Sequence, residues 1–122
     1  MIPADLLDKL REKDPELWGK LQDQLKKLRA YQEGRVYEVD VIATFECLPQ
    51  ISGWILQGLL QDAIRARGWW YQICYGPHVG PDDRHCEVFI WADLTKEYIN
   101  IKGDTEAEAL LRAYLAALEA AE

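Results

Sequence analysis

Cysteine and histidine are scarce in this chain. Its three cysteines, Cys47, Cys74 and Cys86, are an odd number and show no C-x-x-C spacing. A disulfide framework and a structural zinc site are both disfavoured by this pattern. We therefore expect buried free thiols, with no bound metal or cofactor.

Long hydrophobic runs and a secretion signal are also missing. No segment approaches the roughly 20 consecutive apolar residues that a membrane span requires. Residues 1–14 lack the apolar core of a signal peptide. We therefore expect a cytoplasmic protein, located in a host cell, that makes no membrane contact.

Positive charge is in deficit. The chain has 14 Lys and Arg residues against 21 Asp and Glu residues, which gives a formal net charge of -7. This charge repels the phosphates of duplex nucleic acid, so general DNA or RNA binding is disfavoured. It suits a basic partner, such as the nucleic-acid groove of another protein, and it also favours solubility.

What is present is the composition of one globular domain. The chain has 122 residues, of which 49% are hydrophobic and 29% are charged. This length and balance are typical of a single core. We predict one folded unit that consists of an N-terminal helical segment, residues 1–34, and an α+β domain, residues 35–122.

Helix signals open the chain. Leucines among charged residues predict a short helix over residues 5–13. Asp14 then fits an N-cap, with Pro15 as the first residue of a second helix. Leucines at three- and four-residue spacing continue that helix until Gly34, a residue typical of helix C-termini.

The period of the hydrophobic pattern changes to two over residues 36–45. Five hydrophobic residues alternate there with mostly polar ones, which predicts a strand. An apolar helix is predicted next, from Pro49 to Gly68. We expect this helix to be nearly buried, with Gly53 and Gly58 packed closely against the sheet.

Three β-like runs and a last helix complete the pattern. The runs, residues 69–75, 86–92 and 97–102, predict an antiparallel meander. The last helix starts at Thr105, which forms a T-x-x-E capping box with Glu108. The order α-β-α-β-β-β-α predicts an α+β fold with a four-stranded antiparallel sheet and helices packed on it, either on one face or as an α/β/α sandwich.

Two stretches within residues 50–122 carry a distinctive pattern. One is ILQGLLQDAIRARGWWYQICY, a helix that runs into an aromatic strand through an Arg-Gly junction. The other is INIKGDTEAEALLRAYLAAL, a strand followed by an Asp-Thr helix start and an alanine-rich helix. In this pattern residues 50–122 resemble the phage α/β/α sandwich proteins. The resemblance rests on this pattern rather than on a catalytic motif, and it implies a small phage-encoded protein.

The same residues share the topology of the double-stranded RNA-binding domain. That family binds RNA through lysines at the start of its last helix. Here residues 103–108 read GDTEAE, so acidic residues stand where the family needs basic ones. The resemblance therefore does not carry the RNA-binding function to this chain.

The loop GPHVGPDDRH, residues 76–85, is longer than a hairpin requires and holds both histidines, His78 and His85. Its spacing matches no metal site, and Cys86 points away from His85 if both lie in a strand. The chain contains no P-loop, GxGxxG, HExxH or GxSxG motif. We therefore expect a solvated loop, no catalytic residues and a protein that is not an enzyme.

Aromatic and arginine side chains give the stronger functional signal. The run from 69 to 75 places large rings on both faces of one strand, and rings that helices leave uncovered would form a dimer seam or a ligand pocket. Nearby arginines suit a small nucleotide, although they also suit a helix C-terminus. The candidate ligand-binding residues are Arg65, Arg67, Trp69, Trp70, Tyr71, Tyr75, His78, Arg84, His85 and Trp91.

Two hypotheses from different classes follow. In the first, a phage counter-defence protein of the anti-CRISPR kind acts without catalysis and binds either a host defence protein or a small nucleotide signal. In the second, a structural or assembly protein forms a homodimer or larger homo-oligomer through the aromatic face of its sheet.

Overall fold

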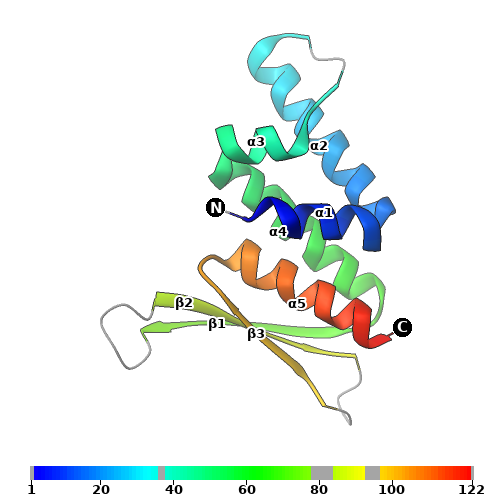
Figure 1. Cartoon of the computed structure of the whole chain (residues 1–122), viewed down its shortest axis with the longest axis vertical. Coiled ribbons are helices and arrows are strands. Elements are labelled where there is room, and N and C mark those ends of the chain that lie inside the picture. Colours follow the sequence, from blue (N-terminus) through cyan, green and yellow to red (C-terminus); the bar gives the residue numbers. More distant parts are fainter. Residues whose placement is uncertain (1, 36–37, 78–83, 93–96, 122) are drawn as a thin grey trace.

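Five helices and a three-stranded sheet make up the described part of the chain (Figure 1). The structure is a computed structural model, and it describes residues 2–35, 38–77, 84–92 and 97–121. The α+β class predicted from the sequence is confirmed.

The two N-terminal helices are α1 (Ala4–Lys13) and α2 (Pro15–Glu33). The Asp14 carboxylate accepts a hydrogen bond from the Leu17 N–H at 3.1 Å, so Asp14 caps α2. The helix ends where Gly34 adopts a φ of 90°, a left-handed value that favours glycine. Both predicted helices and their caps are confirmed.

A short helix, α3 (Val41–Cys47), stands in place of the predicted strand. The Asp40 carboxylate accepts a hydrogen bond from the Ala43 N–H at 3.1 Å, and the Thr44 hydroxyl donates to the Asp40 carbonyl oxygen at 2.7 Å. These bonds start a helix, whose buried residues recur every three or four positions and face α2 and α4. The prediction of a strand over residues 36–45 is wrong for residues 41–45. Its first two residues, 36 and 37, lie outside the described ranges.

The central helix is α4 (Pro49–Ala66). Leu56, Leu60 and Ile64 are fully buried at four-residue spacing, whereas Trp54 is 63% exposed. The expectation of a nearly buried helix is therefore confirmed for one stripe and wrong for the face that carries Trp54.

The two glycines of α4 do not pack against the sheet as predicted. Gly53 faces α5, where a Cβ atom would lie 3.6 Å from the Ala107 Cβ. A Cβ atom on Gly58 would meet no other residue within 4 Å. The close approach at Gly53 therefore joins two helices rather than a helix and a strand.

The sheet consists of β1 (Trp70–Pro77), β2 (Arg84–Trp91) and β3 (Ile99–Gly103). The strands are antiparallel and lie in the order β1-β2-β3, so the predicted meander is confirmed. The described ranges do not contain the predicted fourth strand, because α3 forms where its second half was expected.

The last helix, α5 (Glu106–Ala121), lies directly on the sheet. Thr105 Oγ1 accepts a hydrogen bond from the Glu108 N–H at 3.2 Å, and the Glu108 carboxylate accepts one from the Asp104 N–H at 3.0 Å. The predicted helix start is confirmed, with the return bond one residue earlier than in a standard capping box.

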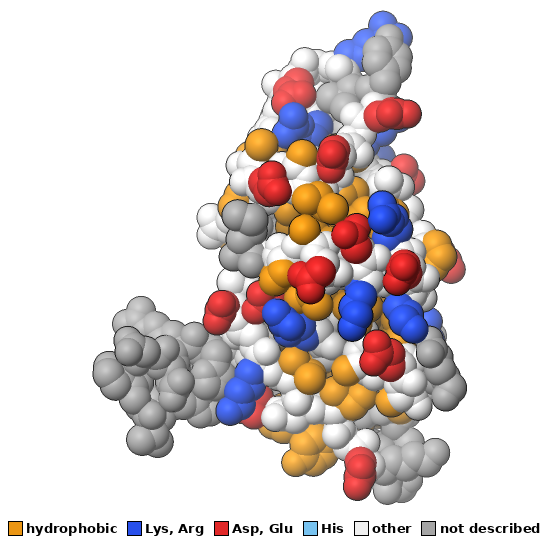
Figure 2. Space-filling model, in the orientation of Figure 1, with side chains coloured by type: hydrophobic (Ala, Val, Ile, Leu, Met, Phe, Trp, Pro, Cys, Tyr) orange, Lys and Arg blue, Asp and Glu red, His pale blue; other side chains and the backbone are white. Residues whose placement is uncertain are grey.

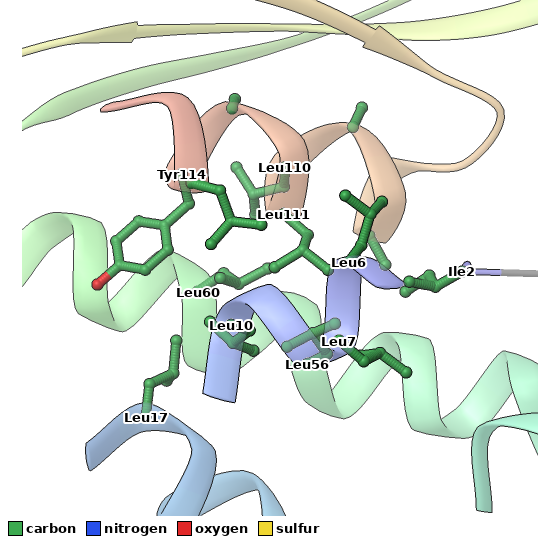
Figure 3. Close-up of a cluster of buried hydrophobic side chains, with 14 of the residues drawn as sticks. Ile2, Leu6, Leu7, Leu10, Leu17, Leu56, Leu60, Leu110, Leu111 and Tyr114 are labelled. Atoms are coloured by element: carbon green, nitrogen blue, oxygen red, sulfur yellow. The ribbon is translucent and has the colours of Figure 1, made fainter. Parts of the chain in front are cut away.

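All five helices lie on one side of the sheet (Figure 1). α5 covers β2 and β3, and α1 and α4 contact α5 from the side away from the sheet. Figure 3 shows hydrophobic side chains of α1, α4 and α5 pointing toward one another, and the buried residues from Ile2 to Leu118 form one cluster. The predicted α/β/α sandwich is therefore not formed by the described residues. We call the face turned away from α5 the outer sheet face.

Candidate functional site

The strands divide their side chains between two environments. Residues that face α5, such as Val88 and Ile90, are buried. Their neighbours in sequence, Phe89 and Trp91, therefore point to the outer sheet face, because strand residues alternate. Trp70 pairs with Trp91 in the β1–β2 register and so lies on the same face.

Four aromatic residues gather on the outer sheet face, and we call Trp70, Phe89, Trp91 and Tyr98 the aromatic patch. The ring centroid of Tyr98 lies 5.4 Å from that of Phe89 and 6.0 Å from that of Trp91. Trp70 is 59% exposed and Tyr98 is 55% exposed, while the other two rings are half-buried. The rings of Phe89, Trp91 and Tyr98 thus pack on one another, and with Trp70 they present a broad apolar surface to solvent.

Polar residues border the aromatic patch. Gln72 and Asn100 are exposed and pair with Phe89 from the two neighbouring strands. Glu87 and Lys102 lie opposite each other farther along β2 and β3. An apolar centre with a polar rim is the usual composition of a protein–protein interface.

A hollow of about 340 Å³ adjoins the aromatic patch at the junction of α4 and β1. Arg65 Nη2 donates a hydrogen bond to the Tyr71 hydroxyl at 2.8 Å, and its guanidinium carbon lies 5.6 Å from the centre of that ring. Trp69 and Trp70 complete the wall. Four of the residues predicted from the sequence to bind a ligand are therefore neighbours here.

Arg67 is held by a different set of contacts. Its guanidinium carbon lies 5.2 Å from the centre of the Trp69 ring, and its Nε donates to the Tyr114 hydroxyl at 3.3 Å. That hydroxyl donates in turn to Asp14 Oδ2 at 2.5 Å. A second hollow, of about 400 Å³, lies beside this chain of hydrogen bonds and includes Lys20 in its wall.

Tyr114 is a candidate functional residue that could not be identified from the sequence. Burial raises the pKa of Tyr114 to about 12, and the hydrogen bond to Asp14 acts in the same direction while Arg67 opposes it. The sequence predicted Asp14 only as a helix cap and did not single out Tyr114. No local signal joins them, because they are 100 residues apart in the sequence.

The predicted ligand-binding residues do not form one group. Arg65, Arg67, Trp69, Trp70, Tyr71 and Trp91 lie at one end of the hairpin. Tyr75 lies near the opposite end, where Arg84 and His85 pair with Pro77 and Gly76. The two ends are separated by about 20 Å at the rise of a strand, and His78 lies outside the described ranges. The structure thus brings six of the ten together.

The cysteines differ from one another in environment. Cys86 is buried beneath α5, and this burial, together with nearby Cys74, raises the pKa of the Cys86 thiol. Cys74 is half-buried and Cys47 is exposed, so the expectation of buried thiols is wrong for these two, while all three are free as expected. A raised pKa makes Cys86 a poor nucleophile at neutral pH.

Two kinds of feature are absent from the described ranges. These ranges contain no group of three or more His, Cys, Asp and Glu side chains placed to hold a metal ion. None of their helices combines the length and the apolar character that crossing a bilayer requires. Comparison of the chain with the models of known protein families, with curated proteins and with solved structures gave no match.

Proposed function

We propose that the protein is a non-enzymatic binding protein that attaches to a partner protein through its outer sheet face. The observation that supports this proposal is the aromatic patch, whose rings of Trp70 and Tyr98 are more than half exposed on a face that no described helix covers. Tryptophan and tyrosine dominate the binding energy of protein interfaces. A cluster of such rings on one rigid sheet is therefore suited to bind a partner in a fixed orientation.

The proposed biological role is counter-defence in a phage-infected cell. The resemblance of residues 50–122 to small phage proteins supports it, and so does the absence of catalytic motifs from the sequence. A net charge of -7 favours a basic partner, and the nucleic-acid groove of a CRISPR effector is basic. The protein would act by occupying that partner in a one-to-one complex.

The test measures binding to purified bacterial defence nucleases, including CRISPR effectors, by calorimetry. We expect near-unit stoichiometry with one of them and inhibition of its nuclease activity. The double variant Trp70→Ser, Tyr98→Ser should bind at least about tenfold more weakly, since it removes two ring anchors. The matched control is Trp54→Ser, Tyr31→Ser, which removes rings that are 63% and 91% exposed elsewhere. Equal losses of binding affinity in both double variants would contradict the proposal.

A second candidate function is sequestration of a small nucleotide signal at the α4–β1 junction. The observation that favours it is the hollow where Arg65 meets Trp69, Trp70 and Tyr71. A base would stack on Trp70, and the guanidinium of Arg65 would exchange Asp62, 3.5 Å away, for a phosphate.

This candidate is tested by titrating the protein with cyclic dinucleotides and with ADP-ribose while tryptophan fluorescence is recorded. Quenching that saturates at one equivalent, and that is lost in Arg65→Gln, is the expected result. Gln61→Glu on the same helix serves as a control for a changed charge near the site. No quenching with either ligand would exclude this function and leave the proposed protein partner unaffected.

A further inference from the structure

A separate hollow of about 510 Å³ lies between α1, β3 and α5, at the opposite edge of the described sheet from the α4–β1 junction. Apolar side chains form part of its wall, among them Leu6, Ile101 and Leu115. In Figure 2, Lys and Arg side chains lie over α1 and α5, with hydrophobic side chains between them and the sheet. The hollow is thus an apolar surface bordered by positive charge.

The charge around this hollow is opposite in sign to that of the whole protein. Lys9, Lys102 and Arg112 line it, with Glu119 as the one carboxylate, whereas the net charge of the chain is -7. Charges farther away than about 10 Å are largely screened at physiological salt, so the local surplus determines what binds. The hollow beside Tyr114 differs, because its acidic side chains outnumber its basic ones.

The three cations are only weakly engaged within the protein. Lys9 Nζ lies 3.8 Å from Glu119 Oε1, and Arg112 Nε lies 3.8 Å from the buried carboxylate of Glu108. The Lys9–Glu119 pair is exposed, and exposed ion pairs at such a distance contribute little to stability. The Arg112 side chain is partly exposed although its partner is buried. In the described part of the chain Lys102 forms no ion pair.

The same hollow runs along an edge of the sheet. In the described sheet β3 pairs with β2 alone, and Asn100, Ile101 and Lys102 of β3 line the hollow. An edge strand presents backbone N–H and C=O groups that a further strand can pair with. The five-residue strand Ile99–Gly103 therefore borders three features at once. These are backbone groups that can pair with a further strand, side chains that can bind carboxylates, and an apolar wall.

We propose that the free edge of β3 binds an extended acidic segment of a partner protein, which adds to the sheet as a fourth strand. Backbone hydrogen bonds to β3 would hold the segment. On the helical side of the sheet its side chains would lie beside Lys9, Arg112, Ile101 and Leu115, and on the outer sheet face its carboxylates would lie beside Lys102. This site does not rest on the aromatic patch, so either surface can be correct without the other.

The test uses the full chain and a fluorescein-labelled eight-residue peptide, Glu-Glu-Val-Val repeated twice, which places Glu and Val on both faces of an extended strand. We expect saturable binding by fluorescence anisotropy that weakens as salt is raised, with changes in the amide NMR signals of residues 99–103. The variant Lys9→Glu, Lys102→Glu, Arg112→Glu should bind at least about tenfold more weakly, because attraction becomes repulsion.

Three controls separate the alternatives. The variant Lys20→Glu, Lys26→Glu, Lys27→Glu changes the net charge equally on α2 and should bind as the unchanged chain does. A peptide with methylated backbone nitrogens should lose binding, as should a peptide with Lys in place of Glu. The proposal is overturned if the acidic peptide does not bind, if either altered peptide binds equally well, or if Trp70→Ser, Tyr98→Ser abolishes peptide binding.

Discussion

At the scale of single residues, Tyr114 connects distant parts of the chain. Its hydroxyl donates to Asp14 at the start of α2 and accepts from Arg67 at the end of α4, while its ring is fully buried. One side chain of α5 therefore fixes the positions of two other helices. Such a hydroxyl contributes to stability only while it keeps its proton.

The first prediction concerns the pH dependence that follows. Folding raises the pKa of Tyr114 to about 12, above its unfolded value of about 10. The stabilisation that the Tyr114 hydroxyl provides is therefore complete below about pH 10, and it is lost as the pH rises through the pKa of the folded state. Urea unfolding at pH 8 should show Tyr114→Phe to be less stable by about 1 to 3 kcal/mol, and this difference should shrink by pH 11.5. A difference that stays constant over this range would contradict the assignment.

At the scale of elements, β3 and α5 approach each other closely at Gly103. A Cβ atom there would lie 2.7 Å from the Ala109 N atom and 2.9 Å from its Cα. Both are backbone atoms and cannot rotate away, so a larger residue at position 103 must displace either the strand or the helix.

The second prediction compares two glycine-to-alanine changes. Gly103→Ala should lower the free energy of unfolding by about 1 to 3 kcal/mol because it overpacks the contact with α5. Gly58→Ala, which faces open space in α4, should raise it by up to about 1 kcal/mol. Thermal and urea unfolding measure both effects, and equal stability of the two variants would contradict the close contact.

Most elements were predictable because their signals are local. Asp14, Thr105 and Glu108 mark helix starts within a few residues, and the three strand runs are bounded by turn residues. Residues 41–47 mislead because their alternating pattern also fits one buried helical face, and packing against α4 decides between the two.

Part of the candidate site was predictable for the same reason. Arg65, Trp69, Trp70 and Tyr71 meet because they lie within seven residues across one helix-to-strand junction. The openness of the outer sheet face could not be predicted, since it depends on where α1 and α2 pack. Those helices join α4 and α5 instead of crossing to the other side of the sheet.

At the scale of the whole molecule, the aromatic patch raises the question of self-association. Two copies that met through their outer sheet faces would bring together chains of net charge -7 each. The third prediction is therefore a monomer of 14.1 kDa by light scattering, independent of concentration. A dimer that dissociates in Trp70→Ser, Tyr98→Ser would instead identify a second copy as the partner and support an assembly role.

Because the core lies on the helical side of the sheet, the exposed rings of the outer sheet face contribute little to keeping the chain folded. Substitutions on the outer sheet face should change the free energy of unfolding little, unlike substitutions beneath α5. If the proposed binding role holds, exchange of these surface rings would change which partner is bound while the architecture stays constant.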